Sequence, residues 1–290
     1  MFTGSHVAIV TPFRKGKVDE RALGDLIEWQ IAKGTNGIVP CGTTGESATL
    51  SHEEHNRVIE LTVEVVRRRV PVMAGTGSNS TDEAISLTKH AKQAGADAAL
   101  LITPYYNKPT QEGLYRHYKA IAEAVDLPLV LYNIPGRTGV NMFPATIARL
   151  AVIETIVGVK EGSGVIQQAS DIVQTCGDRL AVLAGDDAMT LPMMAVGGKG
   201  VITVTANIAP TEMANMVKAF AAGNIEEARR IHFQLSPLFA ALFYETNPIP
   251  VKEALGMMGK IDPELRLPLC SMGKDNRDKL MQVMKEGRFI

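Results

Sequence analysis

A lysine ends an apolar run in the stretch IVGVKEGSG, residues 156–164. The four residues before Lys160 are apolar or glycine, so the run predicts a buried strand with an amine at its end. Burial disfavours the charged form of an amine, and a neutral lysine amine can attack a carbonyl group to form a Schiff base. The alternative interpretation is a lysine that is solvated, or paired with Glu161 or Asp186.

The turn GTTGE, residues 42–46, suits the binding of a small anion. Gly42 and Gly45 let the backbone fold tightly, which leaves the amides of Thr43 and Thr44 free to point at one spot. Two such amides and two hydroxyls fit a carboxylate. An ordinary loop that caps a helix is the alternative interpretation.

Two more polar residues, Tyr132 and Arg137, lie near the end of the preceding apolar run, LPLVLY. Tyr132 ends this run, and neighbouring strand ends lie about 5 Å apart, so phenol and amine could meet. A phenol can carry a proton to and from a carbinolamine. Arg137, in the following loop, is expected to clamp a second carboxylate. The alternatives are a tyrosine that keeps its hydroxyl in water and a surface arginine.

Short β-branched runs alternate with longer amphipathic segments over residues 1–222, and the pattern predicts eight strand-then-helix units. Residues 223–290 contain helical patterns without a strand and are expected to form a C-terminal helical region packed on the preceding domain. The signals for helix ends are an N-cap at Asp19, capping boxes at Ser51/Glu54 and Ser80/Glu83, and a C-cap glycine at Gly95.

Eight strand-then-helix units are the number that closes a (β/α)8 TIM barrel, and a doubly wound open sheet is the alternative. In such a barrel the chemistry lies at the C-terminal ends of the strands. Because side chains alternate along a strand, Lys160 shares a face with Ile156 and Gly158. Val157 and Val159 lie on the other face. If these valines pack against helices, Lys160 points into the barrel.

Composition narrows the class of protein. Hydrophobic residues make up 46% of the 290, and the net charge of −1 gives no field that would attract nucleic acid or anionic lipid. No run approaches the roughly 20 apolar residues of a membrane span. Three widely spaced cysteines suit a reducing cytoplasm, which is the expected location. No cluster of histidines and carboxylates predicts a metal site.

Several motifs in order identify a resemblance along the whole chain. They are GxxxxGTTGES from Gly37 to Ser47, TPYYNKPTQEGLY, Tyr132 with the loop NIPGRTG, Lys160, AGDD, GVITVTANIAP and NPIPVKEAL. Together they resemble the dihydrodipicolinate synthase / N-acetylneuraminate lyase family of class I, Schiff-base aldolases. The resemblance implies a (β/α)8 barrel with C-terminal helices, a homotetramer built as a dimer of tight dimers, and no cofactor or metal.

The resemblance also implies a role for each site residue. Lys160 would form an imine with pyruvate, whose carboxylate Thr43 and Thr44 would hold. The implied proton relay is Tyr132, Thr43 and Tyr106, with Tyr106 reaching in from the partner subunit. Gly185 and Ile202 match positions that line the pyruvate pocket.

The arginine in NIPGRTG favours the synthase branch of the family, in which it meets the carboxylate of L-aspartate 4-semialdehyde. The implied reaction is the first committed step of diaminopimelate and lysine biosynthesis. A sialic acid or keto-sugar-acid lyase is the alternative within the class, and a non-catalytic relative that binds a keto acid is the alternative outside it.

A feedback site for L-lysine is the last implication of the resemblance. His52 and His55 lie three apart on one helix face, but the sequence offers no further ligands for a metal there. The positions that match the lysine site of lysine-sensitive synthases are Ser47, Ala48, His52, His55, Asn79, Glu83 and Tyr105. A carboxylate such as that of Glu83 suits a cationic amino acid.

Overall fold

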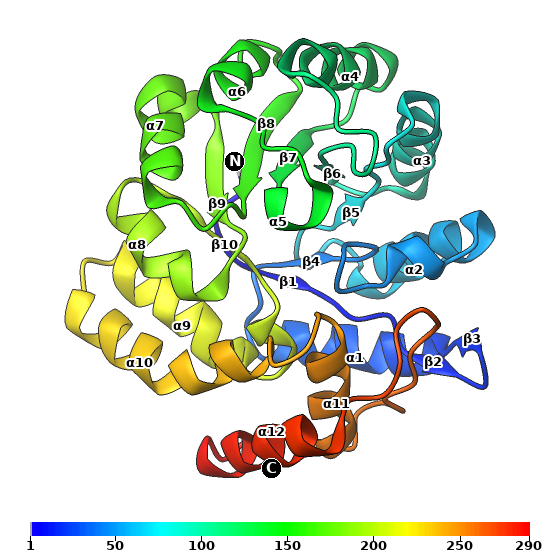
Figure 1. Ribbon diagram of the computed structural model, residues 1–290, viewed down its shortest axis with the longest axis vertical. Coiled ribbons are helices and arrows are strands. Elements are labelled where there is room, and N and C mark those ends of the chain that lie inside the picture. The colour runs from blue at the N-terminus through cyan, green and yellow to red at the C-terminus, as the bar shows by residue number, and fades with distance from the viewer. Residues whose placement is uncertain (1) are drawn as a thin grey trace.

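Eight parallel strands form a ring in the computed structural model, which describes residues 2–290 (Figure 1). Their order is β4-β1-β10-β9-β8-β7-β6-β5, and a parallel bridge between Ile38 and Val72 joins the two end strands. The predicted barrel is confirmed, because this bridge closes what would otherwise be an open sheet. The strands are β1 (Gly4–Ala8), β4 (Gly37–Val39), β5 (Met73–Gly75), β6 (Ala98–Ile102), β7 (Leu129–Asn133), β8 (Ile156–Glu161), β9 (Ala181–Ala184) and β10 (Gly200–Thr203).

Helices surround this ring, as Figure 1 shows. Asp19 caps the first of them by accepting from the amide of Ala22, and Gly95 ends the third with a left-handed φ of 92°, so both local signals are confirmed. The helices around the barrel are α1 (Glu20–Ala32), α2 (His52–Val66), α3 (Thr81–Ala94), α4 (Gln111–Ala124), α5 (Pro135–Thr138), α6 (Pro144–Leu150), α7 (Ile166–Cys176), α8 (Thr190–Ala195) and α9 (Pro210–Ala221). A small hairpin of β2 (Phe13–Arg14) and β3 (Lys17–Val18), which the pattern did not predict, precedes α1.

The two expected capping boxes differ. Ser51 and Glu54 form the reciprocal pair as predicted. At α3, Ser80 accepts from the amide of Glu83, but the hydroxyl of Ser78 satisfies the Ser80 amide at 3.0 Å. The carboxylate of Glu83 therefore does not accept from the Ser80 amide. The predicted second capping box was wrong in this one hydrogen bond.

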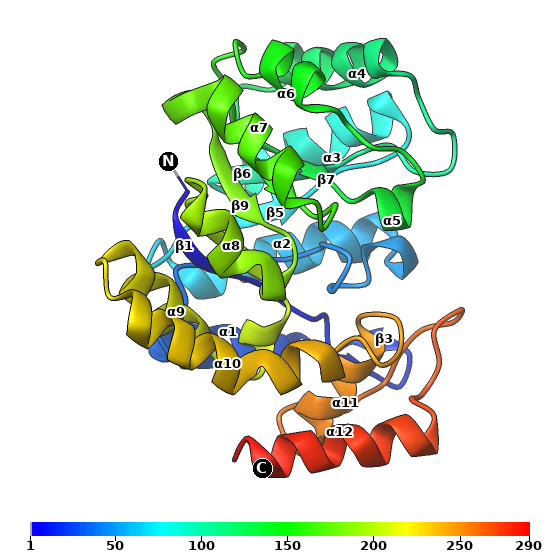
Figure 2. The same cartoon turned by 60° about the vertical axis from the view of Figure 1, so that its left-hand side comes forward.

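The C-terminal helices α10 (Ile225–Ala241), α11 (Ile249–Met257) and α12 (Lys274–Glu286) lie together on one side of the barrel (Figure 2). Their buried side chains, such as Leu238, Leu255 and Leu280, belong to the same apolar core as the outer faces of the strands. The division at residue 222 stays a prediction, with α10 packed directly on α9. None of the helices in residues 2–290 is both long and apolar enough to cross a bilayer.

The strand that carries Lys160 does not alternate as predicted. Leu129 of β7 opposes Ile156 of β8, whereas the next residue, Val130, already opposes Gly158. This bulge places one extra residue in β8, so the side chains before it point to the opposite face from the one predicted. Ile156 consequently packs in the outer core and Val157 against the barrel interior, which is the reverse of the expectation. After the bulge the prediction is right, because Val159 is in the outer core.

Candidate active site

Lys160 and Tyr132 lie directly opposite each other near the C-terminal ends of β8 and β7. The Nζ atom of Lys160 is 4.2 Å from the centre of the Tyr132 ring, and Tyr132 belongs to the apolar cluster inside the barrel. Only 6% of Lys160 is exposed. The expected meeting of amine and phenol side chain is therefore observed, with the amine over the face of the ring.

The two carboxylates that could have paired with Lys160 are engaged elsewhere. Glu161 is buried and accepts hydrogen bonds from the side chains of Asn133 and Gln168, each at 3.0 Å, and from the Ser163 amide at 2.7 Å. Asp186 accepts from the amide of Ala188. Within residues 2–290 no ion pair or hydrogen bond ties up the lysine amine, which leaves it available for a carbonyl compound.

The turn after β4 folds as its glycines indicate. The Gly45 amide donates to the Gly42 carbonyl and the Glu46 amide to the Thr43 carbonyl, both at 3.1 Å. In the described part of the chain, the amides of Thr43 and Thr44 donate to no protein acceptor. These two donors are the expected feature of a carboxylate site.

Asn247 joins this turn to Arg137, and sequence reasoning missed it. Its Nδ2 donates to the Thr44 hydroxyl at 2.9 Å, and its carbonyl accepts from Nη2 of Arg137 at 3.1 Å. Its Oδ1 is buried without a partner in residues 2–290. The motif NPIPVKEAL, which begins at Asn247, was the available signal, although nothing local in it indicated contact with a turn 203 residues earlier.

One cavity of about 460 Å³ opens beside these groups. Its lining includes Thr43, Tyr132, Arg137 and Asn247, together with six residues of the predicted lysine site: Ser47, Ala48, His52, His55, Glu83 and Tyr105. Lys160 is not in the lining and borders the cavity through the ring of Tyr132. Arg137 is exposed as a residue, yet its position in the lining and its bond to Asn247 distinguish it from an ordinary surface arginine.

The remaining predicted residues lie outside that lining. Thr44 and Ile202 are buried, and Ile202 belongs to the apolar interior beside Tyr132. Gly185 donates its amide to the Glu161 carbonyl at 2.7 Å, and a Cβ there would come within 3.0 Å of the same oxygen. Tyr106 is 90% exposed, with a left-handed φ of 72°, and the fold does not bring it to Tyr132 in its own chain.

The predicted lysine site has an acidic centre. Glu83 contacts the Ser78 hydroxyl, and its Oε1 is 2.9 Å from Nε2 of His52. The bond from Ser78 is the main cause that lowers the pKa of Glu83, so this carboxylate stays charged at neutral pH. His55 bonds the Gly75 carbonyl through Nε2 at 2.9 Å, and burial lowers its pKa. Asn79 donates to the Tyr105 carbonyl at 3.2 Å and does not line the cavity.

A parallel (β/α)8 barrel with a lysine at a strand end that has no partner in residues 2–290, and a cavity beside it that Thr43 and Arg137 help to line, defines a barrel enzyme of the Schiff-base type. Residues 1–287 match the model of the dihydrodipicolinate synthetase family, and the chain belongs to this family. The chain is 61% identical over all 290 residues, 100% of both chains, to a 4-hydroxy-tetrahydrodipicolinate synthase of Thermodesulfovibrio yellowstonii. It is 64% identical over 283 residues, 97% of both chains, to that of Syntrophobacter fumaroxidans.

Solved structures agree with this assignment. The Acinetobacter baumannii dihydrodipicolinate synthase, described as chloride inhibited and complexed with pyruvate, has a TM-score of 0.98 and 50% identity, with 100% of both chains covered. An enzyme of Cyanidioschyzon merolae with lysine bound has a TM-score of 0.97 and 41% identity, covering 100% of this chain and 99% of that one. A third relative, with a TM-score of 0.98 and 43% identity, is described as the first monomeric dihydrodipicolinate synthase variant. The match covers 100% of this chain and 98% of that one.

Proposed function

We propose that this enzyme condenses pyruvate with L-aspartate 4-semialdehyde to give 4-hydroxy-tetrahydrodipicolinate, the first committed step of diaminopimelate and lysine biosynthesis. The observation that carries the proposal is the pair of Lys160 and Tyr132 on adjacent strand ends, beside a turn with two free amides. The names of the relatives support the choice of substrates. The free thiols of the three cysteines suit the proposed cytoplasmic location.

The first half-reaction uses the lysine and the turn. The amine of Lys160 attacks C2 of pyruvate, and the resulting carbinolamine takes up a proton and loses water to give a protonated imine. The amides of Thr43 and Thr44 hold the carboxylate of pyruvate. The imine draws electrons from C3, which loses a proton to give an enamine. Because this electron sink is made from the protein, the reaction requires no cofactor.

The second half-reaction uses Arg137. The enamine carbon attacks the aldehyde carbon of the semialdehyde, whose oxygen takes a proton to become the hydroxyl group. The amine of the substrate then adds to the imine carbon and displaces Lys160 as the ring closes. Arg137, held by the Asn247 carbonyl, binds the carboxylate of the semialdehyde. Asn247 thus keeps the two carboxylate sites in a fixed relation, because its side chain bonds Thr44.

Protons reach these intermediates through a relay of Tyr132, Thr43 and the Tyr106 of a partner subunit. The exposure of Tyr106 supports its insertion into a neighbouring site, and the homotetramer built of tight dimers provides that neighbour.

A relay completed by another chain requires association for full activity. Dilution below the dimer dissociation constant is therefore expected to lower the specific activity.

Replacing Tyr132 by phenylalanine tests the relay. The ring that contacts Lys160 is kept and only the hydroxyl is lost, so kcat should fall by about 10²- to 10⁴-fold, the usual contribution of a positioned acid–base group. The pyruvate adduct should still form, although more slowly. Stopped-flow measurement of imine formation, with Tyr118→Phe as a buried control outside the site, checks this. A Tyr132→Phe enzyme of normal kcat would exclude the phenol as a proton carrier.

L-Lysine is proposed as a feedback inhibitor bound in the cavity around Glu83. The anionic carboxylate, beside Ser78 and His52, suits the side-chain ammonium of lysine. Ser47 and Ala48 follow directly on the turn that holds pyruvate, which gives the inhibitor a short route to the active site. The lysine-bound relative supports this assignment.

Replacing Glu83 by glutamine should weaken lysine inhibition by about 10²-fold while leaving kcat unchanged, because a neutral amide lacks the charge-assisted bond. Since the pKa of Glu83 is lowered, inhibition of the unaltered enzyme should not fade through Glu83 protonation until the pH falls below the ordinary carboxylate range. Calorimetric titration with lysine and inhibition curves measure both effects. If the wild-type enzyme gives no heat and no inhibition with lysine, the proposed regulatory site is wrong.

Steady-state assays with two alternative sets of substrates test the proposed reaction as a whole. Turnover with L-aspartate 4-semialdehyde and pyruvate is expected, and N-acetylneuraminate should not be cleaved. The reverse result would assign the enzyme to the sialic acid lyases, and activity with neither substrate would favour the non-catalytic relative.

A further inference from the structure

A buried ion pair stands at the end of the turn that carries Thr43 and Thr44. Oε1 of Glu46 lies 2.6 Å from Nζ of Lys252, on α11 in the C-terminal region. The two side chains are 1% and 0% exposed. Neither residue takes part in the proposed chemistry, so their burial needs another explanation.

The pair belongs to a set of contacts that holds the turn from the barrel side. Nζ of Lys252 also donates to the Thr11 carbonyl at 3.0 Å and lies 4.2 Å from the centre of the Phe13 ring. The Thr11 hydroxyl in turn donates to the Gly45 carbonyl at 2.7 Å. The ammonium group therefore connects Thr11, in the segment after β1, to the carboxylate of Glu46, and Thr11 itself bonds the neighbouring Gly45.

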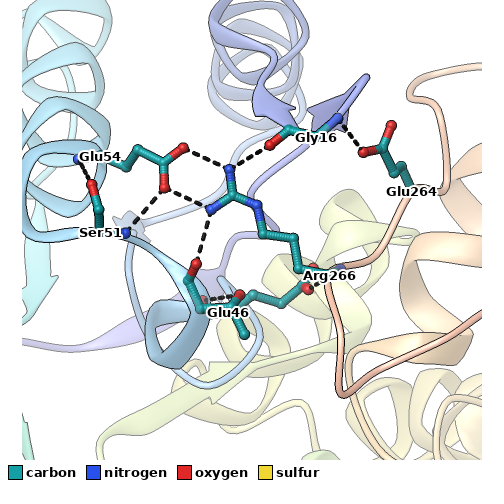
Figure 3. A network of polar contacts seen from close by, with 7 residues as sticks. Gly16, Glu46, Ser51, Glu54, Glu264 and Arg266 are labelled. Atoms are coloured by element: carbon teal, nitrogen blue, oxygen red, sulfur yellow. Dashed lines mark hydrogen bonds and ion pairs between the residues drawn. The ribbon is translucent and has the colours of Figure 1, made fainter.

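Arg266 also contacts the Glu46 carboxylate and joins it to Glu54, as Figure 3 shows. Its amide donates to Oε2 of Glu46 at 3.4 Å, and its guanidinium forms two bonds of 2.6 Å with Glu54 at the start of α2. The guanidinium also donates to the carbonyl of Thr49 at 2.9 Å. Both oxygens of the Glu46 carboxylate thus have partners from the C-terminal region.

The backbone of the turn needs such support. Cys41, which precedes the turn, and Glu46, its last residue, have left-handed φ angles of 55° and 53°. Residues other than glycine persist in this region only where their surroundings hold them there. Between these two strained residues lie Thr43 and Thr44, whose amides have no acceptor in residues 2–290 and would bind the carboxylate of pyruvate.

Stability alone is a poor reason for such a pair. Two charges lose their hydration when they are buried, and a well-packed apolar pair is often as stable or more stable. What an ion pair with two further hydrogen bonds adds is a fixed geometry. Here it fixes Glu46, and through Glu46 the conformation of the turn.

We propose that Glu46 and Lys252 are positioning residues, whose ion pair keeps the amides of Thr43 and Thr44 convergent on the carboxylate of pyruvate. The inference rests on the proposed function of this turn. It also gives the C-terminal region a part in substrate binding, since Lys252 lies on α11 and Arg266 in the segment between α11 and α12.

The test compares a single and a double variant. Lys252→Met leaves the Glu46 carboxylate buried and unpaired, which should destabilise the fold strongly. The double variant Glu46→Gln/Lys252→Met removes both charges at nearly constant volume, so its melting temperature should return close to that of the unaltered enzyme. The matched control is Glu227→Gln/Arg230→Met, which removes an exposed ion pair from α10 in the same region.

Four readouts separate positioning from stability. In the double variant, the KM for pyruvate should rise by about 10- to 100-fold, because small misplacements of binding groups have effects of this size. The kcat and the KM for the semialdehyde should stay near the wild-type values, and borohydride with saturating pyruvate should still label Lys160 fully. The control pair should change none of these quantities.

A double variant that regains both stability and the normal KM for pyruvate would show that the pair serves folding alone, and so would one that fails to fold. A wild-type enzyme without any pyruvate adduct would instead refute the proposed function, so the two failures are distinguishable.

Discussion

Replacing Lys160 by arginine is expected to lower kcat/KM by about 10⁴-fold or more, as for other residues that form the covalent intermediate. A guanidinium keeps its charge at any accessible pH and cannot form the imine. The stability of the fold should change less than the activity, because the larger cation can still lie over the ring of Tyr132. Activity assays and a thermal melt of the same preparation measure both quantities.

The control for this variant is Lys199→Arg, at a lysine that forms an ion pair with Asp178 and lies before β10, away from the strand ends that carry the site. It should retain full activity. A Lys160→Arg enzyme that forms product at the wild-type rate would show that no Schiff base on this residue is needed.

Replacing Arg137 by alanine should lower kcat/KM for L-aspartate 4-semialdehyde by roughly 10²- to 10³-fold. Charge-assisted hydrogen bonds contribute about 1.5–3 kcal/mol each, and about 1.4 kcal/mol corresponds to tenfold. The first half-reaction should be spared, since the pyruvate carboxylate binds to the Thr43 and Thr44 amides. Pre-steady-state imine formation and steady-state kinetics with varied aldehyde separate the two halves.

Arg137→Lys is the informative companion to this variant. A lysine keeps the positive charge but not the planar fork that can bond Asn247 and a carboxylate together, so only part of the loss should be recovered. Equal loss of pyruvate adduct and of aldehyde turnover in Arg137→Ala would contradict the assignment of this residue to the second substrate.

The elements that rest on local signals were predictable from the sequence. The N-cap at Asp19, the capping box at Ser51 and the C-cap at Gly95 each depend on residues within a turn of one another. The barrel followed from the repetition of strand and helix. Lys160 could be placed inside it from a single strand, because only the last residues of β8 decide its direction.

The features that were missed depend on contacts between distant segments. The bulge in β8 arises where β7 pairs with it, and no residue of β8 alone indicates it. The return bond of Glu83 was lost to competition with Ser78, a neighbour that the capping pattern does not consider. Asn247 reaches Thr44 across 203 residues, a separation over which single-sequence patterns carry no information about contacts.

The most direct test of the covalent mechanism is to treat the wild-type enzyme with pyruvate and borohydride and then to map the labelled peptide by mass spectrometry. One adduct per subunit on the peptide that contains Lys160 is the expected result, and it should be absent without pyruvate and in Lys160→Arg. A label on another lysine, or no label from an enzyme that turns over its substrates, would contradict the account.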